Sequence, residues 1–215
     1  MCDKSCIVLV LVNMFSGDQE VILTVYLARR YILSKLVTID SGCIRMVTND
    51  VTVMDVHFKE KKDSEDKHQI LTSIDSDDNE MLTDFQECVD KAVEKARLNS
   101  SISSFFADEE QVRHPLFPSS RKTDDPTYAK CYSFTASSKY DVQVFDAVGN
   151  SIANPASEIH NGTVVRLIID FKAYVYDEEP RIGVYIKGIQ KIRDGEPIKL
   201  KATQTQSMWE LFAEC

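Results

Sequence analysis

The segment from Thr163 to Tyr176 alternates so regularly that it restricts the chain to folds containing a long, two-faced β-strand. Successive side chains of a strand point to opposite faces, so one set can be buried while the other is displayed. The apolar set consists of Val165, Leu167, Ile169, Phe171, Ala173 and Val175. The second set consists of Val164, Arg166, Ile168, Asp170, Lys172, Tyr174 and Tyr176. We expect the apolar set to face a core and the second set to face solvent.

A second strand is expected from Gly183 to Ile192, with Gly188 marking a β-bulge. Its core-facing residues are Val184, Ile186 and Ile189. The polar segment from Asp177 to Arg181 is expected to connect the two strands as a hairpin. Antiparallel pairing then brings aromatic and basic residues together on one exposed surface: Lys172, Tyr174, Tyr176, Tyr185 and Lys187, with Arg166 further along the first strand.

Such a surface suits an extended, negatively charged chain that carries flat rings. Bases stack on aromatic side chains for about 1 to 3 kcal/mol each, and ammonium or guanidinium groups neutralise the phosphates between them. The same tyrosines are also good strand formers whose hydroxyl groups stay in water. The spacing alone leaves both interpretations open.

The chain has 215 residues, 43% of them hydrophobic, which is enough for one well-buried domain. Its net charge of −9 argues against a protein that coats nucleic acid over its whole surface. The distribution is uneven, because the segment from Arg121 to Lys201 contains 12 basic and 11 acidic residues. Binding of nucleic acid is therefore expected on one face only.

The six cysteines form no CxxC pair and no regular framework, which favours a reduced intracellular protein. The four histidines are scattered without zinc-ligand spacing, so we expect no metal site and no cofactor. The apolar run from Cys6 to Val12 is too short for a membrane span and weak as a signal peptide. We expect neither secretion nor membrane association.

Hydrophobic periodicity predicts the remaining elements. Apolar residues recur at helical spacing from Glu80 to Leu98, including Cys88, and the acidic turn before them suits a helix start. Strands are expected at Ile7–Met14, Val51–Lys59, Gln69–Ile74, Tyr128–Phe134 and Asp141–Asp146, the last two joined through Ser137–Lys139. Val21–Ile39 suits strands or a helix, and strands are preferred. Together these elements predict an α+β fold that is mainly a small β-barrel, with one long helix inserted between strands.

The chain resembles the OB-fold single-stranded DNA-binding proteins of tailed phages and large DNA viruses. The resemblance depends on an ordered set of short motifs: Val144-Phe145-Asp146, Gly149, Asn154-Pro155, Asn161 to Val165, Lys172 to Tyr174, and Gly183 to Gln190. It implies a five-stranded OB-type barrel with additional N-terminal strands. The implied domain covers residues 1–206, with an N-terminal extension (1–50) and an inserted helix (80–98). Residues 207–215 form a C-terminal tail.

The resemblance further implies a protein of viral replication or recombination that binds single-stranded DNA without sequence specificity and without catalysis. The proposed groove is lined by Lys172, Tyr174, Tyr176, Tyr185 and Lys187. Additional phosphate contacts are expected from Arg166, Lys139 and Lys191. Implied partners are single-stranded DNA, viral replication proteins and a second copy of the chain. The implied location is the site of viral DNA replication, in the nucleus or cytoplasm of the host.

The end of the chain departs from this family, whose members usually carry an acidic tail that recruits partners. Here the tail has two acids, although Trp209 and Phe212 could anchor a partner. A short amphipathic turn is an equal alternative. Two other functions also remain: a structural or protein-interaction β-barrel of the virion, and a nuclease. The nearest carboxylate grouping for the latter, Asp170 with Asp177 to Glu179, reads better as a solvated turn.

Overall fold

The computed structural model describes residues 35–38, 44–59 and 66–201, and all structural statements below concern these residues. The expected strand at Ile7–Met14, most of Val21–Ile39, and the tail residues Trp209 and Phe212 lie outside them. Only the end of the second segment is described, and it is a strand, as preferred.

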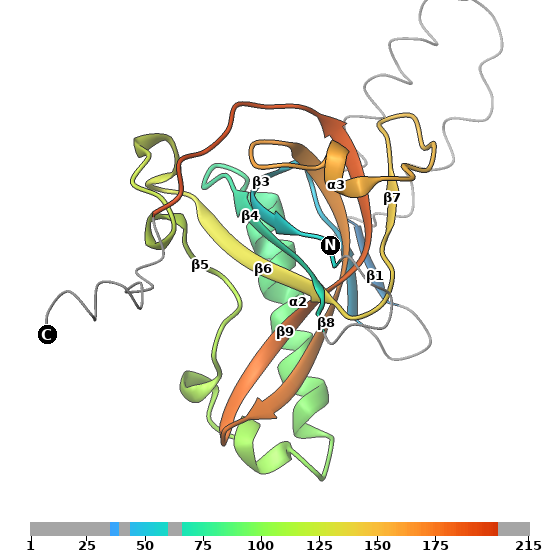
Figure 1. The fold of residues 1–215 in the computed structure, drawn as a ribbon. Helices are drawn as coiled ribbons and strands as arrows, with labels where there is room; N and C mark the ends of the chain where they lie inside the picture. The colour runs from blue at the N-terminus through green and yellow to red at the C-terminus, as the bar shows by residue number, and fades with distance from the viewer. Residues whose placement is uncertain (1–34, 39–43, 60–65, 202–215) are drawn as a thin grey trace, which may run out of the picture. The chain divides into compact units, whose positions relative to one another are not determined.

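The described part is mostly β-structure with few helices (Figure 1). Its strands are β1 (Lys35–Thr38), β2 (Ile44–Val47), β3 (Val51–His57), β4 (His68–Ile74), β5 (Phe117–Pro118), β6 (Tyr132–Ser138), β7 (Gln143–Phe145), β8 (Val164–Tyr176) and β9 (Glu179–Arg193). Its α-helices are α2 (Asn79–Arg97) and the single turn α3 (Pro155–Glu158). Short 3-10 turns occur at Ser103–Phe106, Glu109–Gln111, Ser119–Arg121 and Pro126–Tyr128.

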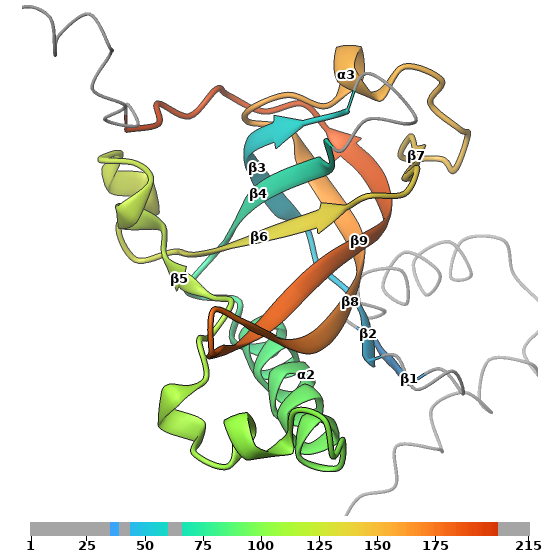
Figure 2. The same ribbon diagram turned by 60° about the horizontal axis from the view of Figure 1, so that its bottom comes forward.

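Five strands pair in an order that returns to its starting strand. β8 pairs antiparallel with β3 and β9, β3 with β4, and β4 with β6. β6 then pairs parallel with β9, the other neighbour of β8. Figure 2 follows this order from β3 and β4 through β6 to β9 and β8. β2 pairs with β8 and β1 pairs with β2, so these two strands extend the sheet beyond β8, and β7 pairs with β9.

Helix α2 is inserted between β4 and β6, and its apolar face packs on the sheet. The Asp78 carboxylate caps its first turn by accepting a hydrogen bond from the Met81 N–H. Phe85 is fully buried, and its ring lies 5.1 Å from that of Phe134 and 4.8 Å from that of Phe171. Burial also raises the pKa of the Cys88 thiol on this face to about 12. The predicted helix and its buried face are confirmed.

The hairpin of β8 and β9 confirms most of the predicted alternation, with three corrections. Val164, predicted to face solvent, is 5% exposed, and the register shifts between it and Val165. The six apolar residues of β8 lie on the core-facing side, and the register shifts beside Gly188, where the bulge was expected. Asp170, predicted to face solvent, is 5% exposed. Its carboxylate accepts bonds from the Arg45 side chain, which removes the cost of burying it unpaired. The connection is also shorter than predicted, because only Asp177 and Glu178 form the turn.

The strands β6 and β3 also differ from the prediction. β6 begins at Tyr132 and continues through Ser138, because its whole length pairs with β4, whereas Tyr128 belongs to a 3-10 turn. In β3 the register shifts between Val53 and Asp55, so that Val53 and Met54 are both buried and strict alternation stops there.

Candidate nucleic-acid interface

A hollow of about 870 Å³ crosses the β9 strand between the ends of β4 and β6 and the hairpin. We call it the tyrosine groove. Its aromatic lining consists of Phe117, Tyr140, Tyr174, Tyr176 and Tyr185. Eight residues were predicted to line a groove or to contact phosphates, and five of them line this one. Four of the five come from the β8–β9 hairpin: Tyr174, Tyr176, Tyr185 and Lys187. Lys139 joins them from the loop after β6, as the sequence predicted.

The charge of the tyrosine groove is opposite to that of the chain. Its cationic lining residues are Lys67, Arg113, Lys139, Arg181 and Lys187. No Asp or Glu is among the described residues that line it. Two of these cations have carboxylates beside the groove, because Arg181 pairs with Glu179 (2.5 Å) and the Lys187 Nζ lies 3.7 Å from Asp170. In a protein of net charge −9, the cationic lining still offers a polyanion a local site of attraction.

The tyrosine side chains lie together because the strand beneath them has no side chain at Gly183. A Cβ atom at this position would lie 3.0 Å from the Tyr174 ring and 3.0 Å from the Tyr185 ring. Burial raises the pKa of the Tyr185 hydroxyl. At the hairpin end, the Arg181 guanidinium lies 5.0 Å from the centre of the Tyr176 ring. The hairpin therefore displays three rings and a cation in one cluster.

The contact at Gly183 predicts that Gly183→Ala weakens binding to single-stranded DNA roughly three- to ten-fold, because the new methyl group displaces both stacking platforms. The unfolding free energy should change by less than about 1 kcal/mol, since the displaced atoms are side-chain ends. Gly188→Ala is the matched control, because its Cβ would meet Ile168 at an ordinary 3.5 Å. Fluorescence titration compares the two variants, and equal affinities would contradict the role of Gly183.

One wall of the tyrosine groove comes from the segment between α2 and β6. The Arg113 N–H donates to the Pro180 carbonyl (2.9 Å), which fixes this segment beside the hairpin. His114 links it to α2, because its Nε2 donates to Gln86 Oε1 (3.0 Å) and its Nδ1 accepts from the Leu116 N–H (3.1 Å). These bonds hold Arg113 and Phe117 at the groove.

The bonds of His114 require a neutral imidazole, and burial lowers its pKa. Below about pH 6.5 the unfolded chain therefore binds more protons, so the free energy of unfolding should fall as the pH falls. His68, whose pKa is also lowered by burial, adds to this trend. Urea unfolding at about pH 7.5 and about pH 5.5 should show a smaller loss in His114→Gln than in the parent protein. An identical loss would contradict the assignment.

Lys172 lines a neighbouring hollow rather than the tyrosine groove. This helix hollow has a volume of about 550 Å³ and lies between β8 and α2. Tyr140, Tyr185 and Lys187 line both hollows. The Lys187 Nζ lies 3.7 Å from the buried Asp170 carboxylate, which the Arg45 side chain binds through Nε (2.6 Å) and Nη2 (2.9 Å).

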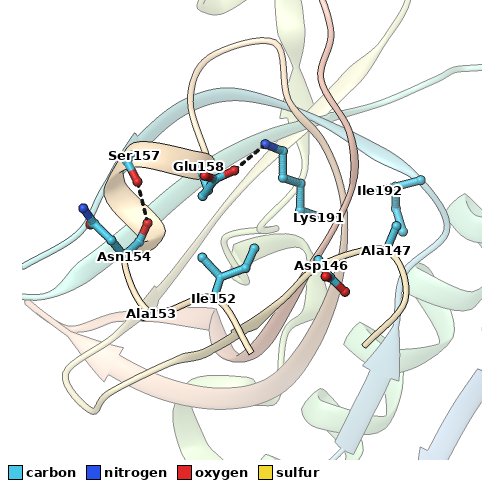
Figure 3. A pocket seen from close by; sticks show the side chains of 9 residues that line it. All are labelled: Asp146, Ala147, Ile152, Ala153, Asn154, Ser157, Glu158, Lys191 and Ile192. Atoms are coloured by element: carbon cyan, nitrogen blue, oxygen red, sulfur yellow. Dashed lines mark hydrogen bonds and ion pairs between the residues drawn. The ribbon is translucent and has the colours of Figure 1, made fainter. Parts of the chain in front are cut away.

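Two predicted phosphate contacts lie outside both hollows. Arg166 is at the other end of β8, where its Nε donates to Asp50 (2.7 Å). The Lys191 Nζ lies 2.9 Å from both Glu158 and Asp194, and these carboxylates raise its pKa. It lines a separate hollow of about 510 Å³ beside α3, where its amine points toward Glu158 (Figure 3). Neither side chain joins the cluster of rings.

Among the cations and tyrosines of the groove, four were not predicted from the sequence: Lys67, Arg113, Tyr140 and Arg181. Tyr140 and Lys67 lie close to the ends of predicted strands, and this position could have identified them as candidates for the groove. Arg113 approaches only through a tertiary hydrogen bond, and Arg181 was interpreted as part of the turn.

The described residues contain no cluster of three His, Cys, Asp or Glu side chains suited to a metal ion. Within the same ranges, no helix combines the length and apolar character needed to cross a bilayer.

Comparisons with known proteins identify a family and a shared fold. The family model described as the single-stranded DNA-binding protein of Enterobacter phage Enc34 matches residues 44–211. A solved structure of the bacteriophage Enc34 protein superposes with a TM-score of 0.60 at 15% identity, covering 82% of this chain and 98% of that one. Its complex with single-stranded DNA superposes with a TM-score of 0.57 at 15% identity, covering 76% and 97%. No curated protein sequence matches.

A solved structure of a second phage protein extends the likeness beyond phage Enc34. Gp2.5, a single-stranded DNA-binding protein encoded by bacteriophage T7, superposes with a TM-score of 0.51 at 10% identity, covering 78% of this chain and 94% of that one. At these identities the superpositions demonstrate a shared fold. The fold is therefore a mostly β arrangement that these phage proteins have in common.

Proposed function

Because the chain belongs to the family of the single-stranded DNA-binding protein of Enterobacter phage Enc34, we propose that it binds single-stranded DNA in the tyrosine groove. The observation that carries the proposal is the lining of this groove. It combines five cations and five aromatic rings with no carboxylate among its described residues. Rings stack on bases of any kind and cations bind any phosphate, so binding is independent of sequence.

The five strands that pair in a ring form an OB-type barrel under this proposal. Support comes from the cyclic order of pairings, in which β6 pairs parallel with β9. OB-type barrels bind their ligands on the face of the second and third strands, beside two loops. Here these strands are β4 and β6, and the tyrosine groove lies between them and the β8–β9 hairpin.

The protein acts by binding and performs no chemistry on the DNA under this proposal. Its role is in viral DNA replication or recombination inside the host cell, with replication proteins as further partners. The alternative of a structural barrel in a virion predicts no retention on single-stranded DNA at low salt. A nuclease would shorten labelled DNA in the presence of magnesium, and we expect no shortened products.

The salt dependence of binding tests the groove. Lys67 and Lys139 flank the paired residues His68 and Ser138, and both side chains line the groove. Replacing both lysines by alanine should weaken binding and reduce the slope of log K against log salt by about 1.4, since each phosphate contact on a single strand contributes about 0.7.

The matched control is Lys91→Ala with Lys130→Ala. It removes the same charge from surfaces outside both hollows. Fluorescence titrations at several salt concentrations measure the slopes. The groove assignment fails if the two double variants have the same slope.

A further inference from the structure

The helix hollow has the chemistry of a nucleotide site, although it lies outside the tyrosine groove. Its volume of about 550 Å³ is within the roughly 300 to 1,000 Å³ of small-ligand sites. Apolar side chains from α2 and β8, including Ala92, Ala96 and Ala173, supply walls against which a base can pack. Lys95, Lys172 and Lys187 supply positive charge for phosphates.

The only carboxylate among the described residues lining the helix hollow does not oppose this charge. Asp170 is 5% exposed, and Arg45 binds both of its oxygens. Lys95 and Lys172 are exposed, and within residues 35–38, 44–59 and 66–201 neither has an ion-pair partner. Their charge is therefore available to a ligand.

The two hollows are adjacent, because Tyr140, Tyr185 and Lys187 line both. We infer that the bound DNA strand turns at Tyr185 and continues from the tyrosine groove onto α2, where Lys95 and Lys172 bind its phosphates. This inference rests on the proposed function and adds a second segment to the binding path. It makes α2 part of the interface, in addition to its role in the core.

Oligonucleotide length separates the two segments. Site sizes of OB folds run from about 4 to about 16 nucleotides, so labelled oligothymidylates of these two lengths are suitable probes. We expect Lys95→Gln in the full chain to bind the short probe as the parent protein does. It should bind the long probe roughly three- to ten-fold more weakly, with a salt slope lower by about 0.7.

Lys91→Gln is the matched control, because Lys91 lies one turn earlier on α2 and pairs with Glu87 (2.7 Å) outside the hollow. If Lys95→Gln binds the long probe as tightly as Lys91→Gln does, the strand does not cross α2. Equal losses with both probes would also overturn the inference, since Lys95 would then belong to the first segment. A parent protein that binds neither probe at low salt would refute the proposed function itself.

Discussion

Replacing Tyr174 and Tyr185 together by alanine should lower the affinity for single-stranded DNA at least about 25-fold. Each base–aromatic stack contributes about 1 to 3 kcal/mol, so losing two costs at least about 2 kcal/mol, and 1.4 kcal/mol corresponds to a factor of ten. Both rings lie against Gly183, where a Cβ atom would be 3.0 Å from each of them. Neither ring is charged, so the salt slope should stay unchanged.

Tyr132→Ala is the control for this double variant. Tyr132 is 41% exposed on β6 but lines neither hollow, so its loss should leave affinity unchanged. Fluorescence titration at several salt concentrations gives affinity and slope together, and urea unfolding verifies the fold. Parent-like affinity in the double variant, or a flattened slope, would contradict stacking on these rings.

Asp170→Asn should lower the free energy of unfolding by about 2 to 4 kcal/mol. Removing one partner of a buried ion pair costs about 3 to 5 kcal/mol, because the other charge stays buried without compensation. Here the Arg45 side chain is 28% exposed, so water offsets part of the loss. An asparagine also turns an amide N–H₂ toward the guanidinium, where the aspartate accepts bonds at 2.6 and 2.9 Å.

Asp50→Asn is the matched control for this substitution. Asp50 pairs at 2.7 Å with Arg166, which lies on β8 like Asp170, but the side chains of Asp50 and Arg166 are substantially exposed. Surface pairs contribute about 0 to 1 kcal/mol, so this loss should be below about 1 kcal/mol. Urea unfolding with equal m-values compares the two. If both substitutions lower the free energy of unfolding by the same small amount, the buried pair of Asp170 contributes no more to stability than the exposed pair of Asp50.

Local patterns in the sequence were sufficient for the elements that form the site. The period-2 alternation from Thr163 to Tyr176 correctly predicted which residues of β8 face the core, because side-chain direction in a strand depends on sequence position alone. The helical spacing around Phe85 and Cys88 likewise predicted the buried face of α2. Tyr174 and Tyr176 of the groove followed from the same alternation, and Tyr185 followed from that of the second strand.

The features that the sequence did not reveal depend on distant partners. Asp170 is buried because it pairs with Arg45, which is 125 residues away in the sequence. A local hydrophobic pattern cannot predict such a pair. Arg113 lines the groove because its N–H bonds to Pro180. The turn at Asp177 and Glu178 has positive φ at both residues, a conformation usually marked by Asn-Gly. Without that signal the connection was predicted to be too long, and Arg181 was assigned to it instead of to β9.

The most direct test of single-strand binding in the tyrosine groove is a fluorescence titration of the full chain with single-stranded and duplex DNA of equal length. At low salt we predict clear binding to the single strand, with log K falling linearly as log salt rises. Binding to the duplex should be much weaker, because its bases are stacked on each other and cannot reach the rings. No binding to single-stranded DNA at low salt, or equal affinity for the duplex, would contradict the account.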